Sequence, residues 1–159
     1  MNAEELFFAT IQSGNKDNVK AQIETNPEIV NSKDSRGFTP LIFATYFNQI
    51  DIAKILLHNN AQIDAKDASG NTALIGVSFK GNIEIAKLLL DHNANINAQN
   101  HQGISPLIYA SMYNQLEMVK FLLKNKADTS LKDKSGKTAL DYAIEKENED
   151  VINLLSAIE

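Results

Sequence analysis

The chain has 159 residues, and its content of 43% hydrophobic and 22% charged residues is typical of one globular domain with its own core. It contains no cysteine, which excludes disulfides and thiol chemistry. Its formal net charge of −5 argues against general nucleic-acid binding, because such binding needs dense Lys and Arg contacts to phosphates. No apolar run approaches the ~20 residues of a membrane span, and the acidic first residues lack the positive region of a secretory signal, so we expect a cytoplasmic protein with no membrane partner.

Residues 1–33 are the first predicted unit. Its apolar residues Val19 and Ile23 stand 33 positions before Ile52 and Leu56, which begin two series of apolar residues with the same spacing. The segment therefore shares the register of the units behind it, although its earlier residues have diverged. We predict that it caps the N-terminal end of a stack.

Residues 34–66 form the second predicted unit, and its local structure follows from the residue types. Asp34 can accept hydrogen bonds from its own turn and Gly37 permits a positive φ, so the two predict a turn. Thr39 and Pro40 then predict the start of a helix, because a Thr side chain caps the first N–H groups and proline needs no N–H in the first turn. A short helix and a longer one with apolar residues at helical spacing should follow.

The same pattern recurs in residues 67–99, 100–132 and 133–159. A glycine and a leucine keep their places every 33 residues: Gly37, Gly70, Gly103 and Gly136, and Leu41, Leu74, Leu107 and Leu140. Neither helix of a unit can bury its apolar face alone, so the units must stack and share one core. The last unit is polar at positions that are semi-buried elsewhere: Asp141, Glu145, Asn153 and Ser156. We therefore expect residues 1–159 to be one complete domain, with residues 133–159 as its C-terminal cap.

Three stretches of the chain carry a resemblance to a known family. FTPLIFATYFNQIDIAKILLHNNAQIDAKD, NTALIGVSFKGNIEIAKLLLDHNANINAQN and ISPLIYASMYNQLEMVKFLLKNKADTSLKD each resemble the ankyrin repeat, and the resemblance extends over essentially the whole chain. The Asn-Pro-Glu-Ile-Val-Asn stretch of the first unit is similar to the opening repeat of small stand-alone bacterial members. The resemblance implies an all-α solenoid of five helix-turn-helix units joined by β-turn finger loops.

The sequence departs from the family pattern at two kinds of position. The usual His after Thr-Pro-Leu is replaced, which removes a hydrogen bond of the family, so we expect these units to rely on packing: Ile42, Ile75, Ile108 and Asp141. Glycines expected at helix ends are replaced in five places: Asn48, Asn60, Asn93, Asn114 and Lys126. Asn tolerates the left-handed conformation well, whereas Lys126 should be strained there.

Residues that could carry out catalysis, or hold a metal or cofactor, form no recognisable site in the sequence. The histidines fall at non-equivalent positions of different units, so we interpret them as surface residues: His58, His92 and His101. Asp51, Glu84 and Glu117 recur at one position, each with a lysine three residues later. That spacing predicts exposed ion pairs within one helix rather than paired catalytic carboxylates. We therefore expect neither an enzyme nor a bound cofactor.

The resemblance implies that a partner protein binds a concave groove lined by the finger loops and the first helix of each unit. One row of finger residues predicts a mildly basic rim: Lys33, Lys66, Gln99 and Lys132, with Arg36, Lys134 and Lys137. A second row follows the repeat glycines, and a third ends the first helices. From these rows we expect the partner-binding residues to be Arg36, Phe38, Tyr46, Phe47, Phe79, Lys80, Ile104, Met112 and Tyr113.

The third row gives the strongest indication of a binding surface, because large apolar and aromatic residues recur there in three consecutive units. Such residues are enriched in interface cores, and a continuous stripe of them on a monomer tends to be a binding site. Two alternatives stay open. The side chains could fold down between units, above all Phe47, which could pack against Phe43. The basic rim could favour an acidic partner or could simply be a solvated surface.

Among the function classes, the resemblance favours a protein–protein interaction module that acts as an adaptor, scaffold or inhibitor and is monomeric on its own. The alternative is a structural, self-associating protein that forms a homodimer through the aromatic stripe. A dimer whose population rises with protein concentration in light scattering would favour the alternative.

Overall fold

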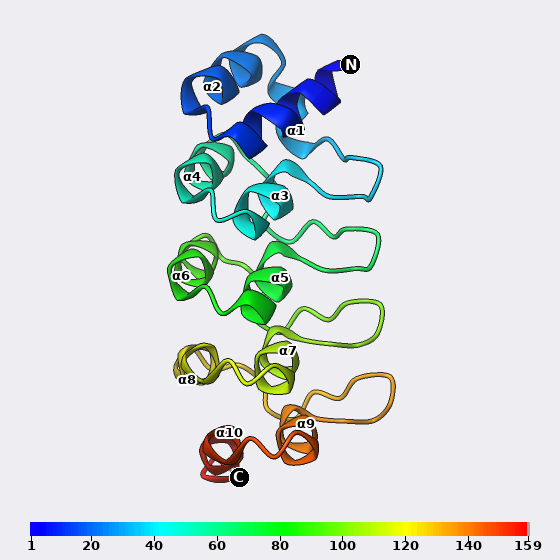
Figure 1. Cartoon of the computed structure of the whole chain (residues 1–159), viewed down its shortest axis with the longest axis vertical. Helices are drawn as coiled ribbons and strands as arrows, with labels where there is room; N and C mark the ends of the chain where they lie inside the picture. Colours follow the sequence, from blue (N-terminus) through cyan, green and yellow to red (C-terminus); the bar gives the residue numbers. More distant parts are fainter. Residues whose placement is uncertain (159) are drawn as a thin grey trace.

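The computed structural model of the chain describes residues 1–158, and within them five helix pairs are stacked in sequence order (Figure 1). The first members of the pairs form one column, which we call the inner helices: α1 (Ala3–Ser13), α3 (Pro40–Tyr46), α5 (Ala73–Lys80), α7 (Pro106–Met112) and α9 (Ala139–Glu145). The second members form a column of outer helices: α2 (Lys16–Thr25), α4 (Ile50–His58), α6 (Ile83–Asp91), α8 (Leu116–Lys124) and α10 (Glu149–Ser156). A short 3-10 helix, η1 (Pro27–Asn31), follows α2.

Four finger loops join the successive pairs and project from the inner column, on the side that faces away from the outer helices (Figure 1). Inner helices pack on one another along the stack, α1 on α3, α3 on α5, α5 on α7 and α7 on α9, and each also packs against the outer helix of its own pair. The predicted all-α solenoid of five units with finger loops is therefore confirmed, and residues 1–158 contain no β-strand.

The hydrophobic core runs the length of the stack and is built from the repeated apolar positions. Three of the recurring leucines are almost fully buried, whereas Leu140 is half-buried because no further helix pair of the described chain covers it. The isoleucines at the family's usual His position have exposed fractions of 6%, 0% and 1%: Ile42, Ile75 and Ile108. Full burial of such a side chain is worth roughly 1.5–3 kcal/mol, so packing does replace the missing hydrogen bond, as predicted.

The inner helices α3, α5, α7 and α9 begin at the predicted caps. In each, a hydroxyl accepts the backbone N–H three residues later: Thr39, Thr72, Ser105 and Thr138. In α9 the cap is reciprocal, because the Asp141 carboxylate also accepts the N–H of Thr138 at 2.9 Å. The expectation of packing is therefore wrong for the last unit, where the exposed Asp141 that replaces the family's His is a helix-capping residue.

The predicted left-handed positions at the helix ends are confirmed. They have φ values between 53° and 68°: Asn48, Asn60, Asn93, Asn114 and Lys126. Glu147, after α9, also has a positive φ of 56°, which we did not predict although it occupies the same register as Asn48 and Asn114. A left-handed residue other than Gly, Asn or Asp costs roughly 1 kcal/mol, so Lys126 and Glu147 are the strained helix ends.

Each finger turn is held by the side chain of its opening residue. One side-chain oxygen accepts the N–H groups of the residues two and four positions later, at 2.9 to 3.0 Å: Asp34, Asp67, Asn100 and Asp133. Neighbouring fingers are then joined by single backbone hydrogen bonds, as between the Ala68 N–H and the Arg36 carbonyl at 3.4 Å. The fingers therefore form one edge of the solenoid, with their opening residues at equivalent places along it.

Candidate functional site

The first predicted row, on the fingers, is used for contacts within the chain. The Nζ of Lys33 donates to the carbonyl of Lys66 at 3.0 Å, and the Nζ of Lys66 donates to the carbonyl of Gln99 at 2.9 Å. The Nε2 of Gln99 continues the series to the carbonyl of Lys132 at 3.0 Å. We call this series the finger ladder. The ammonium groups of Lys33 and Lys66 are directed at the next finger, so the basic rim offers a partner less than the sequence indicated.

The two apolar members of the second predicted row pack on the core. Phe38 and Ile104 are both half-buried against it. The Arg36 guanidinium carbon lies 4.5 Å from the centre of the Phe38 ring, and the Nε and Nη2 of Arg36 donate to Oδ2 of Asp34 at 3.0 and 2.7 Å. Burial alone would raise the pKa of Asp34, but the hydrogen bonds from Arg36 and from the finger backbone hold this pKa below its ordinary value. Arg36 therefore already has a partner inside the chain.

The aromatic residues of the third row are exposed to solvent. Their exposed fractions are 40%, 40%, 37% and 51%: Tyr46, Phe47, Phe79 and Tyr113. Met112, in contrast, is half-buried against the core. Phe47 both packs within the chain and remains available at the surface. Its ring centre lies 4.7 Å from that of Phe43, and 40% of the residue is exposed.

Lys80 reaches back along the stack to the preceding unit. Its Nζ donates to the carbonyl of Tyr46 at 2.7 Å and lies 4.1 Å from the centre of the Tyr46 ring. The contact joins the end of α5 to the end of α3. Lys80 is itself exposed, so its charge remains at the surface of this row.

Ring contacts divide the aromatic residues into two clusters rather than one continuous stripe. The N-terminal aromatic cluster contains Phe8, Phe38, Phe43, Tyr46 and Phe47. The central aromatic cluster contains Phe79, Tyr109 and Tyr113, with ring centres 4.6 to 5.9 Å apart. Tyr109 was not among the residues that we predicted.

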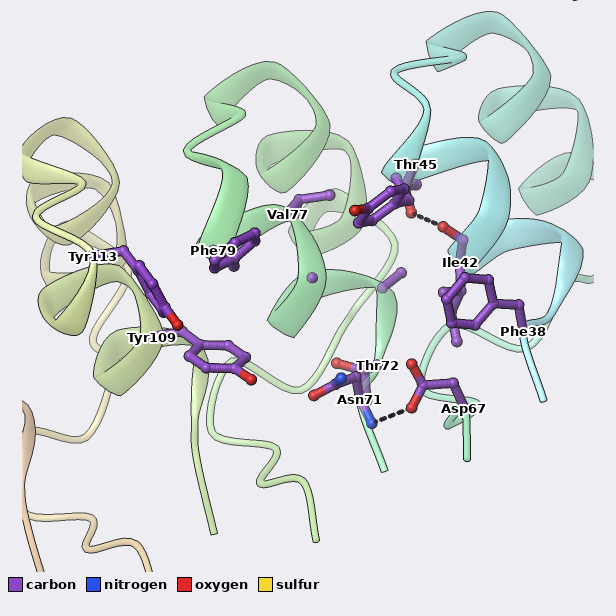
Figure 2. A pocket seen from close by; sticks show the side chains of 13 residues that line it. Phe38, Ile42, Thr45, Asp67, Asn71, Thr72, Val77, Phe79, Tyr109 and Tyr113 are labelled. Atoms are coloured by element: carbon purple, nitrogen blue, oxygen red, sulfur yellow. Dashed lines mark hydrogen bonds between the residues drawn. The ribbon is translucent and has the colours of Figure 1, made fainter. Parts of the chain in front are cut away.

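A cavity of about 310 Å³ lies between the two clusters, bounded by α3, α5, α7 and the adjoining fingers. Figure 2 shows Phe79, Tyr109 and Tyr113 on one side of it and Phe38 on the opposite side. Asp67 and Asn71 lie between these two sides, at the end of the cavity nearest the fingers (Figure 2). Four predicted residues thus line one cavity: Phe38, Tyr46, Phe79 and Tyr113. Arg36, Phe47, Lys80, Ile104 and Met112 are not part of its lining.

The cavity exists because α5 has a glycine where the neighbouring inner helices have aromatic rings. Gly76 occupies the register of Phe43, Tyr109 and Tyr142. A Cβ atom placed on Gly76 would have no atom within 4 Å, so the space beside it is open. Sequence reasoning missed this residue, although the signal was present: a helix-interior glycine in one copy of an otherwise aromatic position.

The equivalent place in α9 shows what a ring does there. The hydroxyl of Tyr142 donates to Oδ2 of Asp133, and this hydrogen bond raises the pKa of Tyr142 to about 12. Burial alone would raise the pKa of Asp133, but the hydrogen bonds from Tyr142 and from the finger backbone hold it below its ordinary value. At the cavity, burial first and the neighbouring Tyr113 second raise the pKa of Tyr109.

The acidic residues on the outer helices form surface ion pairs, only partly in the predicted arrangement. Lys120 pairs with Glu117 at 3.0 Å as expected. Lys87 instead binds Asp91, four residues later, at 2.8 Å. Asp51 pairs with Lys16 of the preceding unit at 3.4 Å, since a long lysine side chain can reach several carboxylates on an exposed face. Such pairs contribute roughly 0–1 kcal/mol each and indicate no chemistry.

Within residues 1–158 no helix has the length and apolarity to cross a membrane, and no three His, Asp or Glu side chains are grouped to hold a metal ion.

Comparison with known proteins identifies the family. No curated protein matches the chain in a sequence search. The family model described as ankyrin repeats (3 copies) matches residues 6–100 and 77–159, which together span almost the whole chain. The chain therefore belongs to the ankyrin-repeat family, whose repeats generally serve as protein–protein interaction modules.

Proposed function

We propose that this ankyrin-repeat protein is a non-catalytic binding module that holds a partner protein against the groove between its fingers and inner helices. The observation that carries the proposal is the exposure of three aromatic side chains that line one cavity, Tyr46, Phe79 and Tyr113, together with Phe47 packed on Tyr46. Exposed apolar surface is unfavourable by roughly 25 cal/mol per Å². The fold does not require rings at these positions, because the last unit has Glu145 and Lys146 there.

The packing of the rings suits them to binding. Tyr46 and Phe47 contact each other, and Phe79 contacts Tyr113, so neither pair must be newly ordered when a partner arrives. Aromatic residues with few rotatable bonds lose little entropy on binding and are enriched among the residues that dominate interface energies. A partner held in this groove has one of its surfaces covered, which fits the role of adaptor, scaffold or inhibitor.

The proposal is tested by affinity purification from the organism's own lysate, followed by mass spectrometry, with the wild type and the triple variant Y46A/F79A/Y113A. We expect the wild type to retain a specific partner and the triple variant to bind it at least ~30-fold more weakly, because each lost hot-spot ring is worth roughly 2 kcal/mol. The matched control K54A/K87A/K120A removes three long side chains from the outer helices and should keep the partner.

The melting temperatures of these variants separate the two interpretations of the rings. Lost binding with a melting temperature within a few degrees of the wild type supports the groove. A large drop in melting temperature would show that the rings serve the core, and retained binding by the triple variant would also overturn the proposal. A dimer in light scattering that the triple variant abolishes would assign the stripe to self-association instead.

A further inference from the structure

The hydrogen bonding of Asp67 differs from that of its equivalents in the other fingers. Its Oδ1 accepts the N–H groups of Ser69 and Asn71, both at 2.9 Å. Its Oδ2, on the half-buried side chain that lines the cavity, accepts no hydrogen bond from residues 1–158. The second oxygen of Asp34 is bound by Arg36, and that of Asp133 by Tyr142.

The sequence explains why Asp67 lacks both kinds of donor. Its own unit has Ser69 in the register of Arg36 and Gly76 in the register of Tyr142. Asn100, in the next finger, has no second oxygen, and its amide donates to the Asn71 side chain at 2.9 Å. One change at Gly76 therefore opens the cavity and also leaves a carboxylate oxygen facing it without a donor.

The aromatic rings on this face show a parallel difference. Four rings have a cation of the same chain near the ring face. Arg36 lies 4.5 Å from the ring centre of Phe38 and 5.8 Å from that of Phe43, Lys80 lies 4.1 Å from Tyr46, and Lys137 lies 5.2 Å from Tyr142. No cation of residues 1–158 is placed in this way over the central aromatic cluster of Phe79, Tyr109 and Tyr113. The Asp67 carboxylate and the rings of the central aromatic cluster thus both lack a nearby cation of the described chain.

We propose that the cavity receives an arginine side chain of the partner protein, whose guanidinium binds Oδ2 of Asp67 and stacks on the rings of Phe79 and Tyr109. The proposal rests on the proposed function, since the partner supplies the arginine. The chain contains its own precedent in Arg36, which donates twice to Asp34 while its guanidinium carbon lies 4.5 and 5.8 Å from two aromatic rings.

Arginine fits this site better than the other donors. A guanidinium is planar, always charged and more weakly hydrated than an ammonium group, so it can stack on rings and bind a carboxylate at once. A tyrosine hydroxyl is a neutral donor, whereas a guanidinium also brings a positive charge to the Asp67 carboxylate and to the ring faces, which favours arginine. Because Lys80 lies over Tyr46, an incoming guanidinium is directed to the Phe79 and Tyr109 side of the cavity.

The test is a titration of the isotope-labelled protein with N-acetyl-arginine methylamide, followed by NMR. We expect the backbone signals of Ser69, Asn71 and Gly76 to shift. The citrulline analogue has nearly the same shape without the charge and should bind at least ~10-fold more weakly, because it loses both the ion pair with Asp67 and the cation–π attraction to the rings. The tyrosine analogue tests the competing occupant.

Two variants have precedents within the chain, so their folding is expected to be intact. In D67N the side-chain oxygen can still hold the finger turn, as that of Asn100 does, while the charge is lost. In G76Y the new ring occupies the register of Tyr142 and fills the cavity. We expect D67N to weaken the arginine probe at least ~10-fold and G76Y to abolish its binding. The matched control G76A adds only a methyl group and should keep it.

Several outcomes would overturn the inference: no shift with the arginine probe, equal binding of citrulline, tighter binding of the tyrosine analogue, or unchanged binding by D67N. The result also separates this inference from the proposed function. If the partner is lost by Y46A/F79A/Y113A but kept by both D67N and G76Y, the groove binds the partner and the arginine pocket is wrong. If the triple variant keeps the partner, the proposed function is wrong and the inference falls with it.

Discussion

The third and fifth helix pairs have the same arrangement of helices and finger, but they differ at one equivalent position of the inner helix, which holds an aromatic ring in one pair and a glycine in the other. In α9 that position is Tyr142, whose ring lies under Lys137 and whose hydroxyl binds the finger residue Asp133. In α5 it is Gly76, which leaves a cavity and a finger carboxylate, Asp67, without a donor to its second oxygen in the described chain. In both pairs a Thr hydroxyl caps the inner helix and an Asp side chain holds the finger turn.

The difference shows that the two tasks of a repeat are carried by different positions. Caps, finger turns and buried aliphatic residues recur and build the stack, so they leave little freedom. The ring position faces the groove, and the chain can use it either to stabilise its own finger or to open space for another molecule. A helix-interior glycine costs roughly 1 kcal/mol relative to alanine, so α5 has the less stable choice.

The largest expected effect on stability comes from placing in α9 the glycine that α5 has at the equivalent position. Tyr142→Gly removes the ring, its hydrogen bond to Asp133 and helix propensity, so we expect the free energy of unfolding to fall by about 2–3 kcal/mol. Urea unfolding followed by circular dichroism measures it. A loss of only about 0.5 kcal/mol would show that the ring does not stabilise the last pair, because the difference in helix propensity between Tyr and Gly alone accounts for roughly that much.

The reverse exchange should act in the opposite direction. Gly76→Tyr adds helix propensity and a ring that packs between the two aromatic clusters, so we expect the free energy of unfolding to rise by about 1–2 kcal/mol. The same urea experiment applies. A decrease would mean that a ring at this position collides with its neighbours, contrary to the open space beside Gly76.

Removing only the hydroxyl isolates the hydrogen bond. Tyr142→Phe should lower the free energy of unfolding by about 1 kcal/mol at neutral pH. Asp133 has a folded-state pKa below its ordinary 3.8, so its share of the stability is present above that value and is lost as the pH falls through the lower folded pKa. Tyr142 has a folded-state pKa raised from 10.0 to about 12, so its share is present below pH 10.0 and is lost as the pH rises through about 12.

The difference between the wild type and Tyr142→Phe should therefore be constant near neutral pH and shrink at both extremes. Unfolding curves across the pH range test this directly. If the difference stayed the same below pH 3.8, the hydrogen bond to a charged Asp133 would not be its source.

The smallest effect is expected for Gly76→Ala. A methyl group meets no atom within 4 Å, so only the helix propensity and the reduced freedom of the unfolded chain should count. We expect the free energy of unfolding to rise by about 0.5–1 kcal/mol, with the arginine probe still bound. A thermal unfolding series of the wild type, Gly76→Ala and Gly76→Tyr places both gains on one scale, and no gain from alanine would point to strain in α5.

The stack could be predicted from the sequence because its determinants are local and repeated. Thr39 caps a helix and Asn48 ends one through their own backbone geometry, and each has copies 33 residues away that confirm the register. The same comparison could have found Glu147, which shares the register of Asn48. Local rules and periodicity were therefore sufficient for the fold.

The site could be predicted only in part, because its features depend on what surrounds a residue. The exposure of Tyr46, Phe79 and Tyr113 followed from their register, but the cavity depends on a side chain that Gly76 does not have. The directions of long side chains could not be predicted either. The sequence position of Lys33 is compatible with a side chain that points to solvent or to the next finger, and the structure shows the second.

The finger ladder has a mechanical consequence. Lys33, Lys66 and Gln99 each tie a finger to the one that follows it, and within residues 1–158 no bond of this series skips a unit. The ladder therefore restrains the spacing of neighbouring fingers directly. Small changes in these spacings can add up from one end of the solenoid to the other, because each unit contacts only its neighbours. A ligand that contacts two neighbouring units therefore meets fingers that are bonded directly to each other, whereas a ligand that contacts distant units meets fingers that the ladder joins only through those between them.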